Sequence, residues 1–159
     1  MTLVNVIAII IIILSLIGGL REGAVKHFFS LLALFIAIPL AGLFYRLIAI
    51  ILSFLPGDNW ENFIGFFIAL CIASIILHLV FLIPAKITRA IWKKGCLVSL
   101  LGGALNLFNA TIGMTVFTLA LRTYPIISWL ERAVTNAGIP TWLVEHFGFV
   151  AAMLPEVFR

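Results

Sequence analysis

The chain contains 159 residues, of which 64% are hydrophobic and 10% are charged, and its formal net charge is +4. Its mean hydropathy is +1.28. Soluble domains are only about half apolar and need a polar surface that this composition cannot supply. The composition therefore excludes a soluble globular domain and predicts an all-α integral membrane protein.

Four stretches are long and apolar enough to cross a bilayer, which takes about 20 mostly apolar residues. The predicted transmembrane helices cover about residues 3–20, 24–44, 63–84 and 98–121. Pro39 is expected to kink the second helix without ending it, because neighbouring helices can satisfy the backbone groups that a proline frees. The apolar stretch 46–54 would make one straight span too long, so we place it in the outer membrane interface.

A polar turn joins the first two spans. Its ionisable residues are Arg21, Glu22, Lys26 and His27, framed by Gly18, Gly19 and Gly23. Glycines permit a tight reversal, basic residues meet anionic headgroups, and Glu22 and Lys26 have the spacing of a helical ion pair. The alternative is that Glu22, Lys26 or His27 lines a polar entrance, because ionisable groups near membrane depth are costly and often functional.

The third span carries two stripes, small residues at Gly65, Ala69 and Ala73 and polar residues at Cys71, Ser74 and His78. Small residues let helices approach closely, and polar ones bond across the contact. His78 is therefore expected to be hydrogen-bonded within the bundle, with a role as a proton carrier as the alternative. Cys71 is two turns from His78, too far to share a metal ion, and we predict that Cys71 and Cys96 are free thiols.

The loop at residues 85–97 is basic and contains a tryptophan. Its predicted headgroup contacts are Lys86, Arg89, Trp92, Lys93 and Lys94. Anionic lipid is the partner that a basic segment of this kind fits at a membrane surface. Nucleic acid is not expected as a partner of so short a loop.

The fourth span has the least expected interior residues. Spacings of four, three and four place Gly102, Asn106, Asn109 and Gly113 on one helix face near the bilayer middle. Such a face usually packs against another helix, with the amides bonding across the contact. A face that lines a solute path and a contact with a partner subunit are the alternatives.

Residues 122–159 change character. Ile126, Ile127, Leu130 and Val134 recur on one helical face, which predicts an amphipathic helix in the interface. Gly138 and Pro140 predict a break after it. The longest apolar run of the second piece, residues 141–154, is too short to cross the bilayer. We therefore expect this piece to lie on the bilayer or to pack on the bundle.

Orientation follows from the basic residues of the short loops. The turn at 21–27 and the loop at 85–97 together hold six, namely Arg21, Lys26, Lys86, Arg89, Lys93 and Lys94. The opposite side holds four, namely Arg46, Arg122, Arg132 and Arg159. We therefore expect the first side to be cytoplasmic and both termini outside. Trp60, Trp92, Trp129, Trp142, Tyr45 and Tyr124 fall at or beyond span ends, as an aromatic belt would.

Motifs of catalysis are missing from the sequence. It has no HExxH, no GxSxG, no glycine-rich phosphate loop and no paired membrane carboxylates. We therefore expect a protein that is not an enzyme and that uses no cofactor and no metal.

The layout resembles the colicin V production protein (CvpA-like) family of bacterial inner-membrane proteins. The first shared motif is the stretch LREGAVKHFFSLL, with Arg21, Gly23, Lys26, Ser30 and Leu31. The second opens the fourth span with Leu101 and Gly102, but Asn106 and Ala110 replace glycines, Asn109 replaces a basic residue, and Val98 and Ser99 replace an Asp-Arg pair. The chain is thus identified as a divergent member.

The resemblance implies a multi-pass protein of the bacterial cytoplasmic membrane, an accessory in envelope homeostasis, export or small-solute transport. On this hypothesis a polar path connects Lys26, His78 and Asn109. The competing hypothesis is a small structural subunit of a larger membrane complex. Association as a homo-oligomer or within such a complex is left open by the sequence.

Overall fold

The computed structural model describes residues 3–53, 59–91 and 95–154, with the backbone alone for 89–91. These residues form helices and no strand. Four helices are long and apolar enough to cross a membrane, which confirms the all-α prediction. They are α1 (Leu3–Glu22), α2 (Ala24–Ile51), α3 (Trp60–Ile91) and α4 (Cys96–Thr123).

Two helices are longer than the sequence analysis predicted. The α2 helix continues through Pro39 to Ile51, so the prediction of a separate interfacial segment at 46–54 is wrong as far as Ile51, and residues 54–58 lie outside the described chain. The reason is that Ala49 is buried and packs against Gly65 of α3, which keeps the last turns of α2 on the bundle. The α3 helix likewise passes Pro84, where the Thr88 Oγ1 donates to the Pro84 carbonyl at 2.8 Å.

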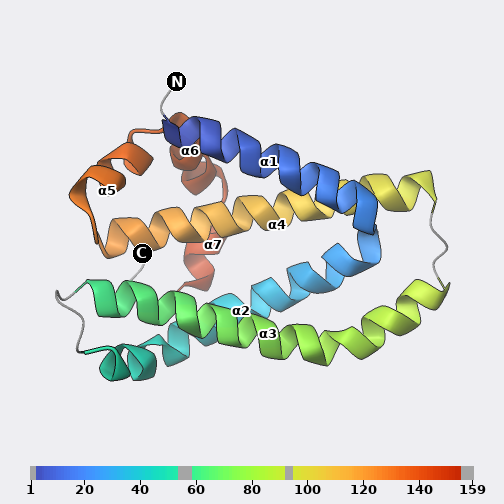
Figure 1. Ribbon diagram of the computed structural model, residues 1–159, viewed down its shortest axis with the longest axis horizontal. Coiled ribbons are helices and arrows are strands. Elements are labelled where there is room, and N and C mark those ends of the chain that lie inside the picture. Colours follow the sequence, from blue (N-terminus) through green and yellow to red (C-terminus); the bar gives the residue numbers. More distant parts are fainter. Residues whose placement is uncertain (1–2, 54–58, 92–94, 155–159) are drawn as a thin grey trace.

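The long helices pack as two pairs. The most extensive contacts join α2 to α3 and α1 to α4, and a contact between α2 and α4 holds the pairs together. Figure 1 shows α1 beside α4 and α2 beside α3, with the start of α1 at the end of the bundle opposite the α1–α2 turn. Gly23 forms that turn with φ of 86°, a left-handed conformation that favours glycine.

The α1–α4 pair crosses at its glycines. A Cβ on Gly102 would lie against the Gly19 carbonyl oxygen and 2.6 Å from the Gly23 carbonyl carbon. A Cβ on Gly19 would lie 2.7 Å from the Gly103 Cα. Only residues without a side chain permit two backbones to approach this closely.

The packed core occupies the half of the bundle that holds the start of α1. Its fully buried members include Ile38 of α2, Phe66 of α3, and Ile112 and Val116 of α4. Beyond Ala69, no described residue of α3 is buried. Figure 1 shows the end of α3 and the start of α4 well apart at the other end of the bundle. The bundle is therefore closed at one half and splayed at the other.

Exposed residues of the long helices are mostly apolar, as a lipid-facing surface requires. The aromatic belt is only partly observed: Trp129 and Trp142 are exposed, and Trp92 lies outside the described residues. Tyr45 and Tyr124 are buried instead. Their hydroxyl groups lie 3.4 Å apart, so the two phenols contact each other inside the protein and not a lipid headgroup.

Three short helices follow α4, namely α5 (Ser128–Thr135), α6 (Gly138–His146) and α7 (Gly148–Met153). In α5 the predicted apolar face meets the core, with Val134 buried and Leu130 packed against it. The break precedes Gly138, and Pro140 lies in the first turn of α6. A proline is tolerated there because the first amides of a helix have no intrahelical partner.

The α6 and α7 helices pack on the bundle. The Ile139 amide donates to Asn5 Oδ1 of α1 at 3.1 Å, and Val150 of α7 is fully buried. The Phe149 ring stacks on Phe35 of α2 and Phe108 of α4, with ring centroids 6.0 and 6.2 Å apart. Of the two alternatives for residues 141–154, packing on the bundle is the observed one.

Candidate functional site

The α1–α2 turn holds a compact charged cluster. Lys26 Nζ lies 2.6 Å from Glu22 Oε1, four residues earlier, as the spacing predicted. The second carboxylate oxygen, Oε2, lies 3.2 Å from His27 Nε2, and His27 is buried. Gly23 makes the cluster because its left-handed conformation turns the chain between Glu22 and the two basic residues.

Two asparagines and a serine of α4 bond to the backbones of the other helices. Asn106 Nδ2 donates to the Ser15 carbonyl of α1 at 2.6 Å. Asn109 Nδ2 donates to the His27 carbonyl of α2 at 3.3 Å, and the Ser99 hydroxyl donates to the Leu20 carbonyl. Asn106 and Asn109 therefore serve different interfaces, α1–α4 and α2–α4, although their spacing places them on one face.

Gly113 departs from the predicted buried face. It is exposed, and a Cβ placed on it would meet no atom within 4 Å. The four-residue stripe is therefore buried at Gly102 and open at Gly113. The contact of α1 with the stripe extends from Gly102 to Asn106, which bonds to Ser15, and it does not reach Gly113.

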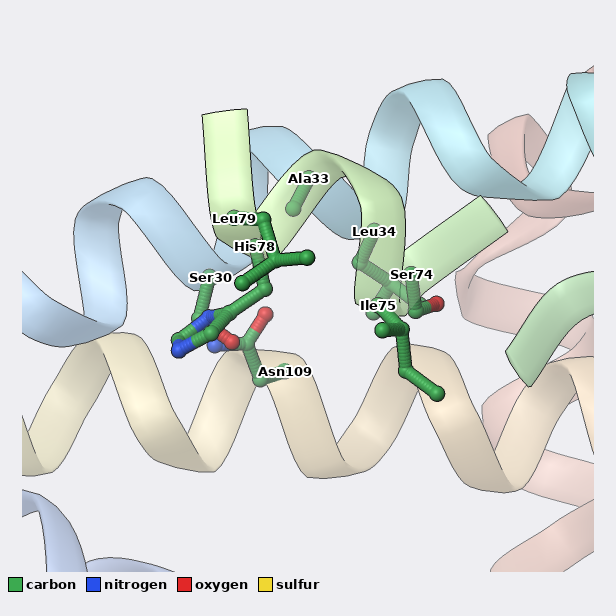
Figure 2. A pocket seen from close by; sticks show the side chains of 8 residues that line it. All are labelled: Ser30, Ala33, Leu34, Ser74, Ile75, His78, Leu79 and Asn109. Carbon is green, nitrogen blue, oxygen red and sulfur yellow. The ribbon is translucent and has the colours of Figure 1, made fainter. Parts of the chain in front are cut away.

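A cavity of about 360 Å³ lies between α2, α3 and α4, and we call it the inner chamber. It is half open on the α3 side, where its lining residues Ile75, His78 and Leu79 are exposed, so the expected burial of His78 within the bundle is not observed. Figure 2 shows the His78 ring of α3 and the Asn109 amide of α4 pointing toward one another in the chamber. Its lining is half polar and half aliphatic, comprising Ser30, Ala33, Leu34, Ser74, Ile75, His78, Leu79 and Asn109.

A second cavity of about 240 Å³ lies between α2 and α3, and we call it the basic vestibule. Lys26 and Lys86 line it, together with Phe29, His78, Phe81, Leu82 and Ala85. His78 is thus common to both cavities. Lys26 therefore lines the vestibule, Asn109 the chamber and His78 both.

The remaining candidate residues lie elsewhere. Arg21 lines a separate cavity with Gly95 and Ser99 at the α1–α4 end, and Asn106 faces Ser15. Among the proposed headgroup contacts, Lys86 is exposed and lines the vestibule. The other four, Arg89, Trp92, Lys93 and Lys94, lie outside the residues whose side chains the structure describes. Both cysteines are free and exposed, as predicted.

Ser30 is a lining residue that the sequence analysis did not select as a site residue. The available signal was its position four residues after Lys26, on the same face of α2. Ser74 and His78 have the same spacing on α3 and were noted as a polar stripe. Cys71, the third member of that stripe, does not line the chamber.

The opposite end of the bundle holds a hydrogen-bonded cluster of Tyr45, Arg46 and Tyr124. Arg46 Nε donates to the Tyr45 hydroxyl at 3.4 Å, and Tyr45 contacts Tyr124. Burial, followed by the hydrogen bond with Tyr45, raises the pKa of Tyr124 above its ordinary value. The Tyr124 phenol therefore stays uncharged at neutral pH.

The family model for the colicin V production protein matches residues 4–148. The chain belongs to this family. No curated protein and no solved structure shows a significant match to it. With its four apolar helices, membership in the colicin V production family identifies a multi-pass membrane protein.

The family's motif positions fall at structural junctions of this fold. Gly23 makes the α1–α2 turn, and Gly102 makes the α1–α4 crossing. Lys26 lines the vestibule and Ser30 the chamber. Ser99, Asn106 and Asn109 replace the residues that the resemblance implies at these positions. Their side chains donate the hydrogen bonds from α4 to α1 and α2.

Replacing Asn109 by leucine is expected to lower the free energy of unfolding by about 0.5–2 kcal/mol, because the bond to the His27 carbonyl is lost. The measurement is unfolding of the purified protein in mixed micelles as denaturing detergent is added. The matched control is Asn136→Leu, an exposed position outside the long helices. Equal stability of the Asn109 variant and the unmodified protein would contradict the assigned bond.

Proposed function

We propose that this chain is a transport-accessory protein of the bacterial cytoplasmic membrane, serving envelope homeostasis or export, which gives a small solute a polar path between α2, α3 and α4. The observation that carries the proposal is the position of His78 in both cavities. It joins the lysines of the vestibule to Asn109 in the chamber.

The depth of the chamber supports a path. Asn109 lies 13 residues after Cys96, the first residue of α4, and therefore about 20 Å along that helix. A hydrocarbon core is about 30 Å thick, so the chamber lies deep within it. Polar side chains are costly at this depth and are characteristic of solute pathways.

The splayed half of the bundle supports access from the basic end. Arg21, Lys26 and Lys86 lie at that end, and basic residues in short loops favour the cytoplasmic side. The start of α1 lies at the opposite end, which fits our proposal that the termini are outside. The closed core around Phe66 would then separate the chamber from the outside.

The proposed partners are anionic headgroups of the bilayer, which Lys86 and the basic loop after it would contact. Association as a homo-oligomer or in a larger complex is compatible with this role. The competing function is that of a structural subunit. The support for this alternative is the row of exposed isoleucines on α3, such as Ile72 and Ile76, which a partner protein could cover. Lipid chains would cover the same residues equally well, so the row does not favour a partner.

Labelling of single cysteines tests the path. In a Cys71→Ala, Cys96→Ala background, Ser74→Cys places a thiol in the chamber, whereas Ile72→Cys places one on the exposed face of the same helix at similar depth. We expect a small, membrane-impermeant thiol reagent to modify the first at least about tenfold faster, because a thiol in lipid cannot ionise and react.

The side of addition tests the orientation in the same experiment. The reagent should modify Ser74→Cys in inside-out vesicles and spare it in right-side-out vesicles. Equal, slow modification of both cysteines would refute the path. Fast modification in right-side-out vesicles alone would reverse the proposed orientation.

A further inference from the structure

The inner chamber presents one hydrogen-bond acceptor whose direction is fixed. Asn109 Nδ2 donates to the His27 carbonyl, so the amide cannot be turned around without placing two oxygen atoms against each other. Its Oδ1 is buried and has no hydrogen-bond partner within the described part of the chain. A buried acceptor left unpaired is costly, and a ligand with a donor would recover that cost.

The other polar groups of the chamber are adaptable. The hydroxyls of Ser30 and Ser74 and the ring of His78 can each donate or accept. Aliphatic side chains, among them Leu34 and Ile75, complete the wall. The ligand that matches this lining has an apolar body and a polar end that carries a hydrogen on oxygen or nitrogen.

The charges around the chamber favour an uncharged ligand. No Asp, Glu, Lys or Arg is among its lining residues, so an ion would lose its hydration without gaining a counter-charge. Lys26 and Lys86 line the vestibule, which is the entrance of the proposed path, and ammonium groups at an entrance repel cations. Glu22, which pairs with Lys26, offsets only one of these two charges.

We propose that the inner chamber binds a small uncharged molecule with an apolar body and one hydroxyl or uncharged N–H group, which donates to Asn109 Oδ1. This inference rests on the proposed path and names the class of solute that the path would take. The volume of about 360 Å³ suffices for an aromatic ring, since an engineered cavity of about 150 Å³ in another protein holds benzene.

Binding of three probes of similar size tests the inference. Phenol carries the donor, anisole has a methyl group in its place, and phenyltrimethylammonium carries a positive charge. Affinities of the full-length protein in lipid nanodiscs would be measured by titration calorimetry, with protein-free nanodiscs subtracted to remove partition into lipid. We expect phenol to bind at least about tenfold more tightly than anisole, because only phenol satisfies Oδ1.

The cation should not bind measurably. Ser74→Trp should abolish binding of both neutral probes by filling the chamber. Asn109→Leu should reduce the ratio to about one. The probe comparison on the unmodified protein remains decisive if either variant fails to fold.

Equal affinity for phenol and anisole, or tight binding of the cation, would overturn the inference. Phenol binding that survives Ser74→Trp would also overturn it, because the probe would then lie elsewhere. Fast labelling of Ser74→Cys without a preference for phenol would refute the solute class while the path stands. Slow labelling together with no phenol binding would refute both.

Discussion

Replacing Gly102 by alanine is expected to lower the free energy of unfolding by about 3 kcal/mol or more. The added methyl group would overlap the Gly19 carbonyl oxygen and lie 2.6 and 2.8 Å from two backbone atoms of Gly23. Overpacking against movable side chains costs about 1–3 kcal/mol. Here the neighbours are backbone atoms, so α1 and α4 must separate to make room.

Gly113→Ala is the matched control in the same helix. A Cβ at that position meets nothing within 4 Å, and alanine is favoured over glycine in a helix by about 1 kcal/mol. The two substitutions should therefore change stability in opposite directions. Unfolding in mixed micelles, followed by circular dichroism, gives both values. Destabilisation by Gly113→Ala as large as that by Gly102→Ala would contradict the crossing.

Truncating Phe66 to alanine is expected to cost about 3–5 kcal/mol, the range for a large ring removed from a packed core. Phe66 is 0% exposed, and its ring lies edge-on to Tyr45 at 6.5 Å between centroids. Inside a membrane, packing contacts of this kind hold helices together, because lipid is as apolar as the side chains.

Phe44→Ala is the control for Phe66→Ala. Phe44 is 53% exposed on α2, so its loss exchanges a lipid contact for another lipid contact and should cost less than about 1 kcal/mol. The same unfolding assay compares the two variants. If the core seals the outer end, Phe66→Ala should also let an impermeant reagent reach Ser74→Cys from the outside. Equal costs for both truncations would place the core elsewhere.

The four long helices could be predicted from the sequence because a bilayer imposes a simple condition on length and apolarity. The Glu22–Lys26 pair could be predicted from spacing, since residues four apart are neighbours on any helix. The end of α2 could not be predicted from the sequence, because it depends on the packing of Ala49 against Gly65 of α3. Features that follow from local sequence rules could thus be predicted, whereas features that depend on contacts between residues far apart in the sequence could not.

Some features of the candidate site could likewise be predicted from the sequence, and others could not. Lys26, His78 and Asn109 stand out as polar residues in apolar helices, which the sequence makes visible. Their meeting along two adjoining cavities depends on which helices pair and how far α3 separates from α4. The opposite outcome at Gly113 shows the same dependence, because a regular stripe on one helix does not determine how far its neighbour follows it.

The pairing of α1 with α4 has a consequence for biogenesis. The α1 helix packs mainly on α4, and about a hundred residues separate Glu22 from Thr123, the ends of these helices. At roughly 5–20 residues per second, about 5–20 s of synthesis separate them. During that interval the glycines of α1 face lipid or the insertion machinery, so any factor that shields a nascent helix would act on this protein between the insertion of α1 and that of α4.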